Sequence, residues 1–186
     1  MARLLERYKT EVAPALREEF SYSTPMAVPI LTKVVVSMGL GRALTEKKRL
    51  EIAAAELALI TGQKALVCKA TKSVANFKLR EGDKVGLKVT LRGRRMYEFV
   101  DRLINAVIPR MRDFRGLNPK AFDGQGNYNM GFSEQGVFPE IDAGRTDFQQ
   151  GMNITFVTTA PTNEPARRLL ILLGMPFRTE EVKHGH

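Results

Sequence analysis

Two segments alternate strictly between apolar and polar residues, and this alternation limits the possible folds more than any other feature. The apolar positions are Val85, Leu87, Val89 and Leu91 in the first segment and Met152, Ile154 and Phe156 in the second. Because successive side chains of a strand point to opposite faces of a sheet, each segment has one face for a core and one face left open. The sequence therefore predicts a sheet that is covered on one side only.

Periodicity and turn residues place the remaining elements. We expect helices over 3–20, 45–61, 96–108 and 162–174, and strands over 33–38, 65–70, 85–91, 127–132 and 152–158. Pro14 should bend or interrupt the first helix and Pro109 should end the third, while Thr45 and Gly62 fit the two ends of the second. The order predicts an α+β fold with a single, mainly antiparallel sheet, helices packed on one face and a long loop excursion.

The chain has the length of one domain, which we assign to residues 1–178. Residues 110–150 form the loop excursion, and residues 179–186 form a flexible tail. The glycines and prolines of the excursion leave it little core to pack against, so we expect it to be mobile and cleaved first between Gly116 and Gly136.

The net positive charge of +9 is concentrated in residues 64–115, which hold 14 Lys and Arg against 5 Asp and Glu. The rest of the chain is close to neutral. Charge gathered in this way indicates a surface for a polyanion, with a merely solvated basic face as the alternative. Within the stretch, residues 71–84 form a polar connection that is longer than a hairpin needs. It is either part of the surface for a polyanion or a solvated loop without a function.

The open sheet face should carry hydroxyl, amide and lysine groups. The residues expected there are Val35, Ser37, Lys69, Lys88, Thr90, Asn153 and Thr155, next to the arginines of 92–95. Such groups bond phosphates and 2′-hydroxyls, and the face lacks the aromatic pairs on which single-stranded bases stack. The pattern favours a folded RNA, with a solvated polar sheet face as the alternative.

Metal and cofactor chemistry finds little support in the sequence. Cys68 is the only cysteine, so the chain cannot form an internal disulfide, and this fits a cytoplasmic protein. The pattern around Cys68 predicts a small buried apolar residue. His184 and His186 lie in the tail, so we expect no metal site. We also expect no cofactor, and no membrane contact because no apolar run approaches about 20 residues.

The motifs that could serve an enzyme are weak. Residues 38–41 hold two glycines of a dinucleotide fingerprint without the third, and residues 122–127 fit turn chemistry better than a calcium loop. Glu140 and Asp142 are an unsupported carboxylate pair. We expect no enzyme. A nucleotide-dependent enzyme using Gly39 and Gly41, and a free RNA chaperone, remain the alternatives.

Long stretches of the chain resemble one family, the bacterial large-subunit ribosomal proteins numbered five, which bind 5S ribosomal RNA. The resemblance lies in SMGLG at 37–41, TGQKALVCKATKSVANFKLREG at 61–82, KVTLRGRRMYEFVDRLI at 88–104, PRMRDFRGL at 109–117, FDGQGNYNMG at 122–131, FPEID at 138–142 and MNITFVTTA at 152–160. One departure is Ser37, where that family usually has Asn, and the tail after Arg178 lies outside the family pattern.

The resemblance implies a structural protein of the central protuberance of the large ribosomal subunit. Its implied partners are 5S rRNA, 23S rRNA, P-site tRNA, small-subunit ribosomal protein thirteen and other 5S-associated large-subunit proteins. For rRNA binding we expect Ser37, Gln63, Lys69, Lys88, Thr90, Arg92 and Arg94. For the tRNA-contacting loop we expect Lys72, Ser73, Asn76, Phe77, Lys78 and Arg80, and for the inter-subunit bridge Arg112 and Arg115.

Overall fold

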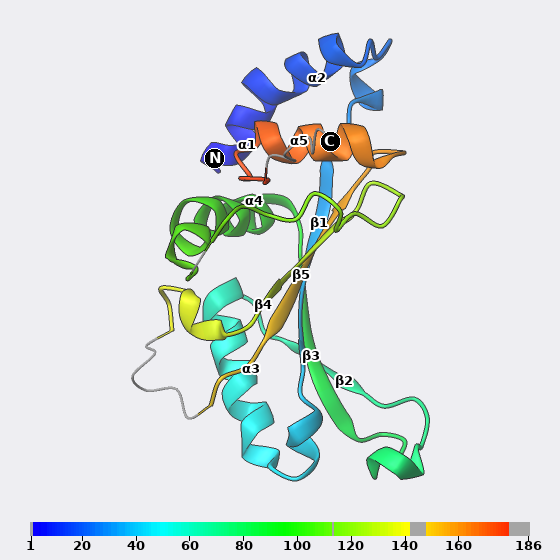
Figure 1. Ribbon diagram of the computed structural model, residues 1–186, viewed down its shortest axis with the longest axis vertical. Coiled ribbons are helices and arrows are strands. Elements are labelled where there is room, and N and C mark those ends of the chain that lie inside the picture. Colours follow the sequence, from blue (N-terminus) through cyan, green and yellow to red (C-terminus); the bar gives the residue numbers. More distant parts are fainter. Residues whose placement is uncertain (1, 113, 142–147, 179–186) are drawn as a thin grey trace, which may run out of the picture.

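A five-stranded antiparallel sheet forms the centre of the computed structural model (Figure 1), and its strand order is β2-β3-β1-β5-β4. The structure describes residues 2–112, 114–141 and 148–178. The strands are β1 (Leu31–Gly39), β2 (Leu66–Lys69), β3 (Lys84–Leu91), β4 (Tyr128–Phe132) and β5 (Met152–Thr158). The predicted single antiparallel sheet is confirmed, and β5 has the predicted bounds.

The helices lie on one face of the sheet and at one of its ends. They are α1 (Arg3–Arg7), α2 (Ala13–Glu19), α3 (Lys47–Thr61), α4 (Gly93–Arg102) and α5 (Asn163–Leu172). Figure 1 shows α3 and α4 on the same side of the edge-on sheet, with α1, α2 and α5 gathered at the upper end. The other side of the sheet carries no α-helix among the described residues.

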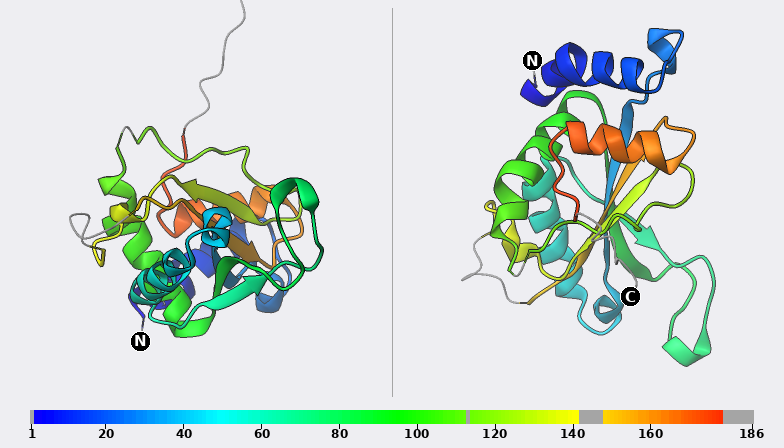
Figure 2. Two further views of the ribbon diagram at one scale, coloured as in Figure 1. Left: turned by 90° about the horizontal axis from the view of Figure 1, so that it is seen from below. Right: turned by 45° about the horizontal axis from the view of Figure 1, so that its top comes forward.

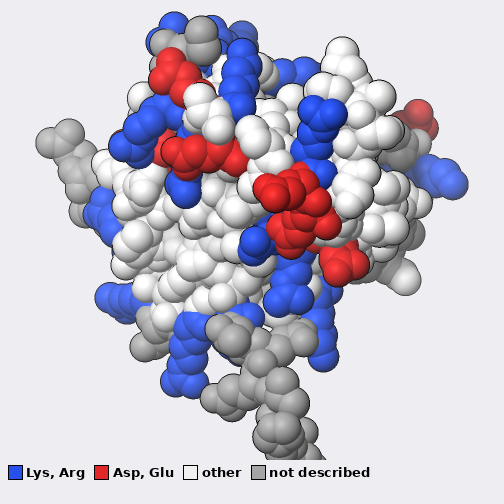
Figure 3. Space-filling view, turned by 90° about the horizontal axis from the view of Figure 1, so that it is seen from above, with Lys and Arg blue, Asp and Glu red and all other residues white. Residues whose placement is uncertain are grey.

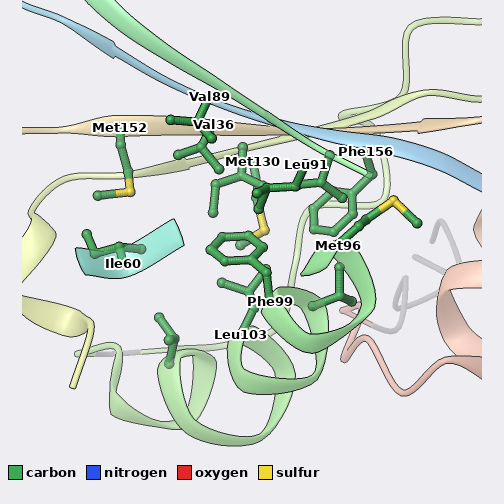
Figure 4. Packing of buried hydrophobic residues seen from close by; sticks show 14 of the residues in the cluster. Val36, Ile60, Val89, Leu91, Met96, Phe99, Leu103, Met130, Met152 and Phe156 are labelled. Carbon is green, nitrogen blue, oxygen red and sulfur yellow. The ribbon is translucent and has the colours of Figure 1, made fainter. Parts of the chain in front are cut away.

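The core lies between the sheet and the two covering helices. In Figure 4 the buried side chains of the strands, among them Val36, Val89 and Phe156, point toward Phe99 of α4 and Ile60 of α3. Burying one such side chain contributes about 1.5–3 kcal/mol, so this layer holds the sheet and helices together. The predicted alternation is confirmed, because the polar positions between these residues are exposed or half-exposed.

Each of two prolines follows a widened helical turn. The predicted first helix runs from α1 through a π-helical turn, Tyr8–Val12, into α2, whose start holds Pro14. A second π turn, Leu103–Val107, follows α4 and leads into a 3-10 turn that contains Pro109. Proline has no N–H and its ring clashes with the carbonyl four residues back, so the wider turn lets the chain continue. The helix therefore passes Pro109 by one residue and does not stop before it.

Helix α3 ends as predicted and begins differently. Gly62 has φ +65°, a left-handed conformation that glycine adopts without a Cβ clash, and it closes the helix. Thr45 is not the cap: its hydroxyl donates a hydrogen bond to the Arg42 carbonyl at 2.9 Å, inside the preceding 3-10 turn. Glu46 occupies the N-cap position without a side-chain hydrogen bond.

The segment 110–150 packs far better than the sequence predicts. Besides β4, it contributes Leu117, Phe138 and Ile141 to the core, and the rings of Phe99 and Phe138 stack with centroids 6.3 Å apart. The expectation that this excursion has little core to pack against is therefore wrong for its described residues. Residues 142–147 and the predicted tail 179–186 lie outside the described residues.

Candidate nucleic-acid interface

The pairing of the strands arranges polar side chains in rows across the uncovered side of the sheet, which we call the open face. Ser37 of β1 lies opposite Lys88 of β3 on one side and opposite Asn153 of β5 on the other. The next row on this face places Val35 between Thr90 and Thr155. These six residues are exposed or half-exposed, as the sequence predicts.

The row through Thr155 continues to the edge strand β4. Asn129 lies opposite Thr155, and the Thr155 hydroxyl donates a hydrogen bond to Asn129 Oδ1 at 2.6 Å. Sequence reasoning did not place Asn129 on this face, although a signal was present. Tyr128, Met130 and Phe132 alternate with Asn129 and Gly131, and this alternation assigns the asparagine to the open face.

Gln63 and Arg92 both lie near Thr90, close to the C-terminal end of β3. Gln63 is half-buried, and its Nε2 donates a hydrogen bond to the Thr90 carbonyl at 3.4 Å, which ties the turn after α3 to β3. Arg92 follows Leu91 in an extended conformation, immediately before α4, with its side chain exposed. The structure therefore brings Gln63, Thr90 and Arg92 close together.

Arg94 is less available than the sequence suggests. Its Nε donates to Glu98 Oε1 at 2.6 Å within α4, and this contact raises the pKa of the guanidinium above its ordinary value. The guanidinium stays positively charged but has an internal partner. A ligand would have to compete with Glu98 for it.

The β2 edge differs from its predicted arrangement. Cys68 is half-buried and lies opposite Gly86, so the expectation that it is a buried core residue is wrong. Leu66 lies opposite Lys88 and is 67% exposed, which the sequence pattern does not indicate. The pairing shifts between Cys68 and Lys69, and Lys69 lies opposite Lys84. Strand β2 thus adds apolar surface as well as charge.

The connection between β2 and β3 is an ordered protrusion, which we call the hairpin loop (residues 70–83). Figures 1 and 2 show it extending away from the sheet. Val74 and Leu79 exchange backbone hydrogen bonds of 2.9 and 3.1 Å, the Glu81 amide donates to Ser73 Oγ at 3.0 Å, and the Arg80 amide donates to Asp83 Oδ2 at 2.8 Å. The loop therefore has a defined shape without support from the core.

The predicted contact residues of the hairpin loop all face solvent. Exposed side chains are found at Lys72, Ser73, Asn76, Phe77, Lys78 and Arg80. Phe77 is 75% exposed and lies outside the core cluster, so it does not anchor the loop to the sheet. The exposed ring is instead available to stack on a ligand.

Arg112 and Arg115 lie away from the hairpin loop. Both are exposed and border a hollow with Asn129 and Gly131 of β4, the strand at the opposite edge of the sheet from β2. The Arg178 side chain donates to the Arg115 carbonyl at 3.3 Å. These arginines therefore belong to a separate surface.

The end of the molecule formed by α1, α2 and α5 has mixed charge. Figure 3 shows acidic and basic side chains interspersed there, and two of the pairs are Arg7 with Glu11 and Arg168 with Glu19, at 3.2 and 2.6 Å. The hairpin loop holds three basic residues, Lys72, Lys78 and Arg80, against the acidic Glu81 and Asp83.

The motifs considered for metal or acid–base chemistry have structural roles. Asp123 accepts hydrogen bonds from the Asn127 side chain and from the Gln125 amide, at 2.7 and 2.8 Å, and these bonds lower the pKa of its carboxyl group. Glu140 forms an ion pair with Arg102 at 2.8 Å, while Asp142 and the two tail histidines lie outside the described residues. Within the described ranges, no cluster of three potential metal ligands occurs and no helix is long and apolar enough to span a membrane.

Comparison with known proteins gives one family over most of the chain. A family model described as Ribosomal protein L5 matches residues 24–80, and a model described as ribosomal L5P family C-terminus matches residues 84–177. Large ribosomal subunit protein uL5 of Alkaliphilus oremlandii (strain OhILAs) is 58% identical over 177 residues, which cover 95% of this chain and 99% of that protein. The uL5 protein of Heliobacterium modesticaldum (strain ATCC 51547 / Ice1) is 56% identical over 180 residues, covering 97% and 100%. That of Streptococcus thermophilus (strain CNRZ 1066) is 57% identical over 175 residues, covering 94% and 97%.

Proposed function

The chain belongs to the ribosomal protein L5 family, and on that premise we propose that the open face of its sheet binds 5S ribosomal RNA. The protein is a structural constituent of the large ribosomal subunit, which is cytoplasmic in bacteria, and it is not an enzyme. Its general partners are ribosomal RNA and ribosomal proteins. The proposal concerns which RNA is bound and where.

The observation that carries the proposal is the row Lys88–Ser37–Asn153 next to the row Thr90–Val35–Thr155. An ammonium group, hydroxyls and amides lie side by side on an uncovered surface, with Arg92 at the end of β3. Lysine and arginine neutralise phosphates, and hydroxyl and amide groups bond riboses and phosphates. The face therefore suits the backbone of a folded RNA, including the adjoining 23S rRNA.

The decisive experiment is filter binding of 5S RNA to a Lys88→Ala/Thr90→Ala/Arg92→Ala variant. Removing these three polar side chains should weaken binding by about 2–4 kcal/mol, roughly 30-fold to 1,000-fold. The matched control is Arg7→Ala/Lys9→Ala/Thr10→Ala, which removes the same residue types from exposed positions at the α1 end and should bind normally. Circular dichroism checks both folds, and wild-type affinity in the folded open-face variant would refute the proposal.

We infer that the hairpin loop contacts P-site tRNA. Its four exposed basic residues, Lys72, Lys78, Arg80 and Lys84, lie on or beside a protrusion whose shape is fixed by internal hydrogen bonds. The exposed ring of Phe77 can stack on a base, an interaction worth about 1–3 kcal/mol. Since the loop leaves the open face uncovered, both RNAs can bind at once.

We also propose that Arg112 and Arg115 belong to the inter-subunit bridge with small-subunit ribosomal protein thirteen. Their separation from the hairpin loop by the full width of the sheet supports a partner other than the tRNA. Cross-linking from a cysteine placed at position 112 in assembled ribosomes would test this. Cross-links only to RNA would contradict the assignment.

A further inference from the structure

A pocket on the helical side of the sheet has an excess of positive charge. It is open, has a volume of about 960 Å³ and lies at the N-terminal end of α3. Arg42, Glu46, Lys48, Arg49 and Phe148 are among the described residues that line it, and these residues supply three cations against one carboxylate. We call it the α3 pocket.

Arg49 is the unusual member of this set. Its side chain is only 9% exposed, and its guanidinium lies 4.2 Å from the centre of the Phe148 ring. Its ion pair with Glu46 spans 3.5 Å, and its Nε has no hydrogen-bond partner among the described residues. A buried guanidinium normally has acceptors for its N–H groups, because taking an unpaired charge out of water is costly. Among the described residues of the α3 pocket, positive charge exceeds negative charge and one buried N–H group of Arg49 has no acceptor.

The backbone adds to this potential. Helix α3 has 15 residues, and no side chain caps its first turn, since Glu46 makes no capping bond. The free N–H groups and the dipole of a helix N-terminus favour an anion. The exposed Arg42 and Lys48 flank the same opening, so a bound anion would meet charge from several directions.

We propose that the α3 pocket binds a backbone phosphate of an RNA segment different from the one on the open face. Helix α3 packs on the buried face of the sheet, so the α3 pocket lies on the other side of the molecule from Ser37 and Lys88 (Figure 1). Arginine forks match phosphate oxygens, and the net charge of +2 on the described lining residues of an open hollow suits a polyanion. The protein would thus hold RNA on two opposite sides. This inference goes beyond the function proposed above and does not require the open face to bind.

The test is a titration of the ¹⁵N-labelled full chain with a short RNA duplex and, separately, with inorganic phosphate. RNA should shift the Nε–H resonance of Arg49 and the amide resonances of Arg42 and Lys48. An Arg42→Ala/Lys48→Ala variant, altered only at exposed side chains, should abolish these shifts while keeping its fold by circular dichroism. The matched control Arg7→Ala/Lys9→Ala should keep them. In the variant the slope of log K against log salt should fall in magnitude by about 1 for each phosphate that is no longer neutralised.

The outcomes separate this inference from the open-face proposal. Shifts at Arg49 that persist in the Lys88→Ala/Thr90→Ala/Arg92→Ala variant support the α3 pocket, whatever happens at Ser37. Shifts with inorganic phosphate but not with RNA would show a site for a small free anion and overturn the assignment to RNA. A silent Arg49 resonance with both probes would overturn the inference altogether.

Discussion

Ser37 of β1 lies directly opposite Lys88 of β3, and the pair occupies two neighbouring inner strands of the sheet. Ser37→Asn should strengthen 5S RNA binding by about 0.5–1.5 kcal/mol, because an amide reaches further than a hydroxyl and offers both donors and an acceptor. Filter binding measures the change, with Ser23→Asn, an exposed site in the turn after α2, as the control. Equal or weaker binding by Ser37→Asn would contradict the role given to this position.

Replacement by alanine should change the stability of the protein differently at Gly86 and at Gly39, which lie opposite each other in β3 and β1. A Cβ on Gly86 would lie 2.8 Å from the Met38 carbonyl oxygen, whereas a Cβ on Gly39 would meet nothing within 4 Å. Gly86→Ala should therefore lower the free energy of unfolding by about 1–3 kcal/mol. Gly39→Ala should leave it unchanged or raise it by up to about 1 kcal/mol, since alanine restricts the unfolded chain. Urea denaturation of both variants is the measurement, and equal effects would refute the steric argument.

The two tyrosines between α1 and α4 differ in the state of their hydroxyls. The rings of Tyr97 and Tyr8 have centroids 6.5 Å apart. The Tyr8 hydroxyl donates a hydrogen bond to the Pro29 carbonyl at 3.0 Å, whereas the Tyr97 hydroxyl has no hydrogen-bond partner among the described residues. Tyr97→Phe should raise the free energy of unfolding by about 1 kcal/mol at pH 7, and Tyr8→Phe should lower it by a similar amount. Denaturant midpoints compare the pair. A loss of stability in Tyr97→Phe would mean that its hydroxyl has a partner.

Stability should fall in alkaline solution. Burial raises the pKa of Tyr97 and of Tyr128 to about 12, above the value near 10 of an unfolded chain. A pKa raised in the folded state leaves stability intact below pH 10 and removes it between pH 10 and 12, by up to about 2 kcal/mol for each tyrosine. Unfolding curves across this range, compared with those of Tyr97→Phe, should show a smaller loss in the variant. Equal losses would remove Tyr97 as a cause.

Shortening the hairpin loop should separate its function from that of the open face. Replacing residues 74–80 by a tight turn removes the exposed Phe77, Lys78 and Arg80 but no core residue. 5S RNA binding should stay near wild type, while ribosomes carrying the variant should retain P-site tRNA less well. Filter binding and tRNA retention assays give the two values. If 5S RNA binding collapses while the fold survives, the loop belongs to the 5S surface.

The sequence predicted those parts of the fold whose pattern is local. Strand β3 alternates from Leu87 to Leu91 and β5 from Met152 to Phe156, and the rows of the open face follow once those strands pair with β1. The packing of Leu117 and Phe138 was missed because turn residues separate them and no period connects them. Arg49 lies in a basic run that indicates solvent exposure, and its burial depends on Phe148, which lies far along the chain.

The strand order also constrains when the sheet can form during synthesis. Strand β1 pairs with β3 and with β5, yet β5 begins only at Met152. A nascent chain in which β5 has not yet been synthesised can pair β1 with β3, but it does not yet contain Asn153 and Thr155. Pairing of such distant segments must wait until both exist. The complete open face is therefore assembled only late in translation, after β5 has been synthesised.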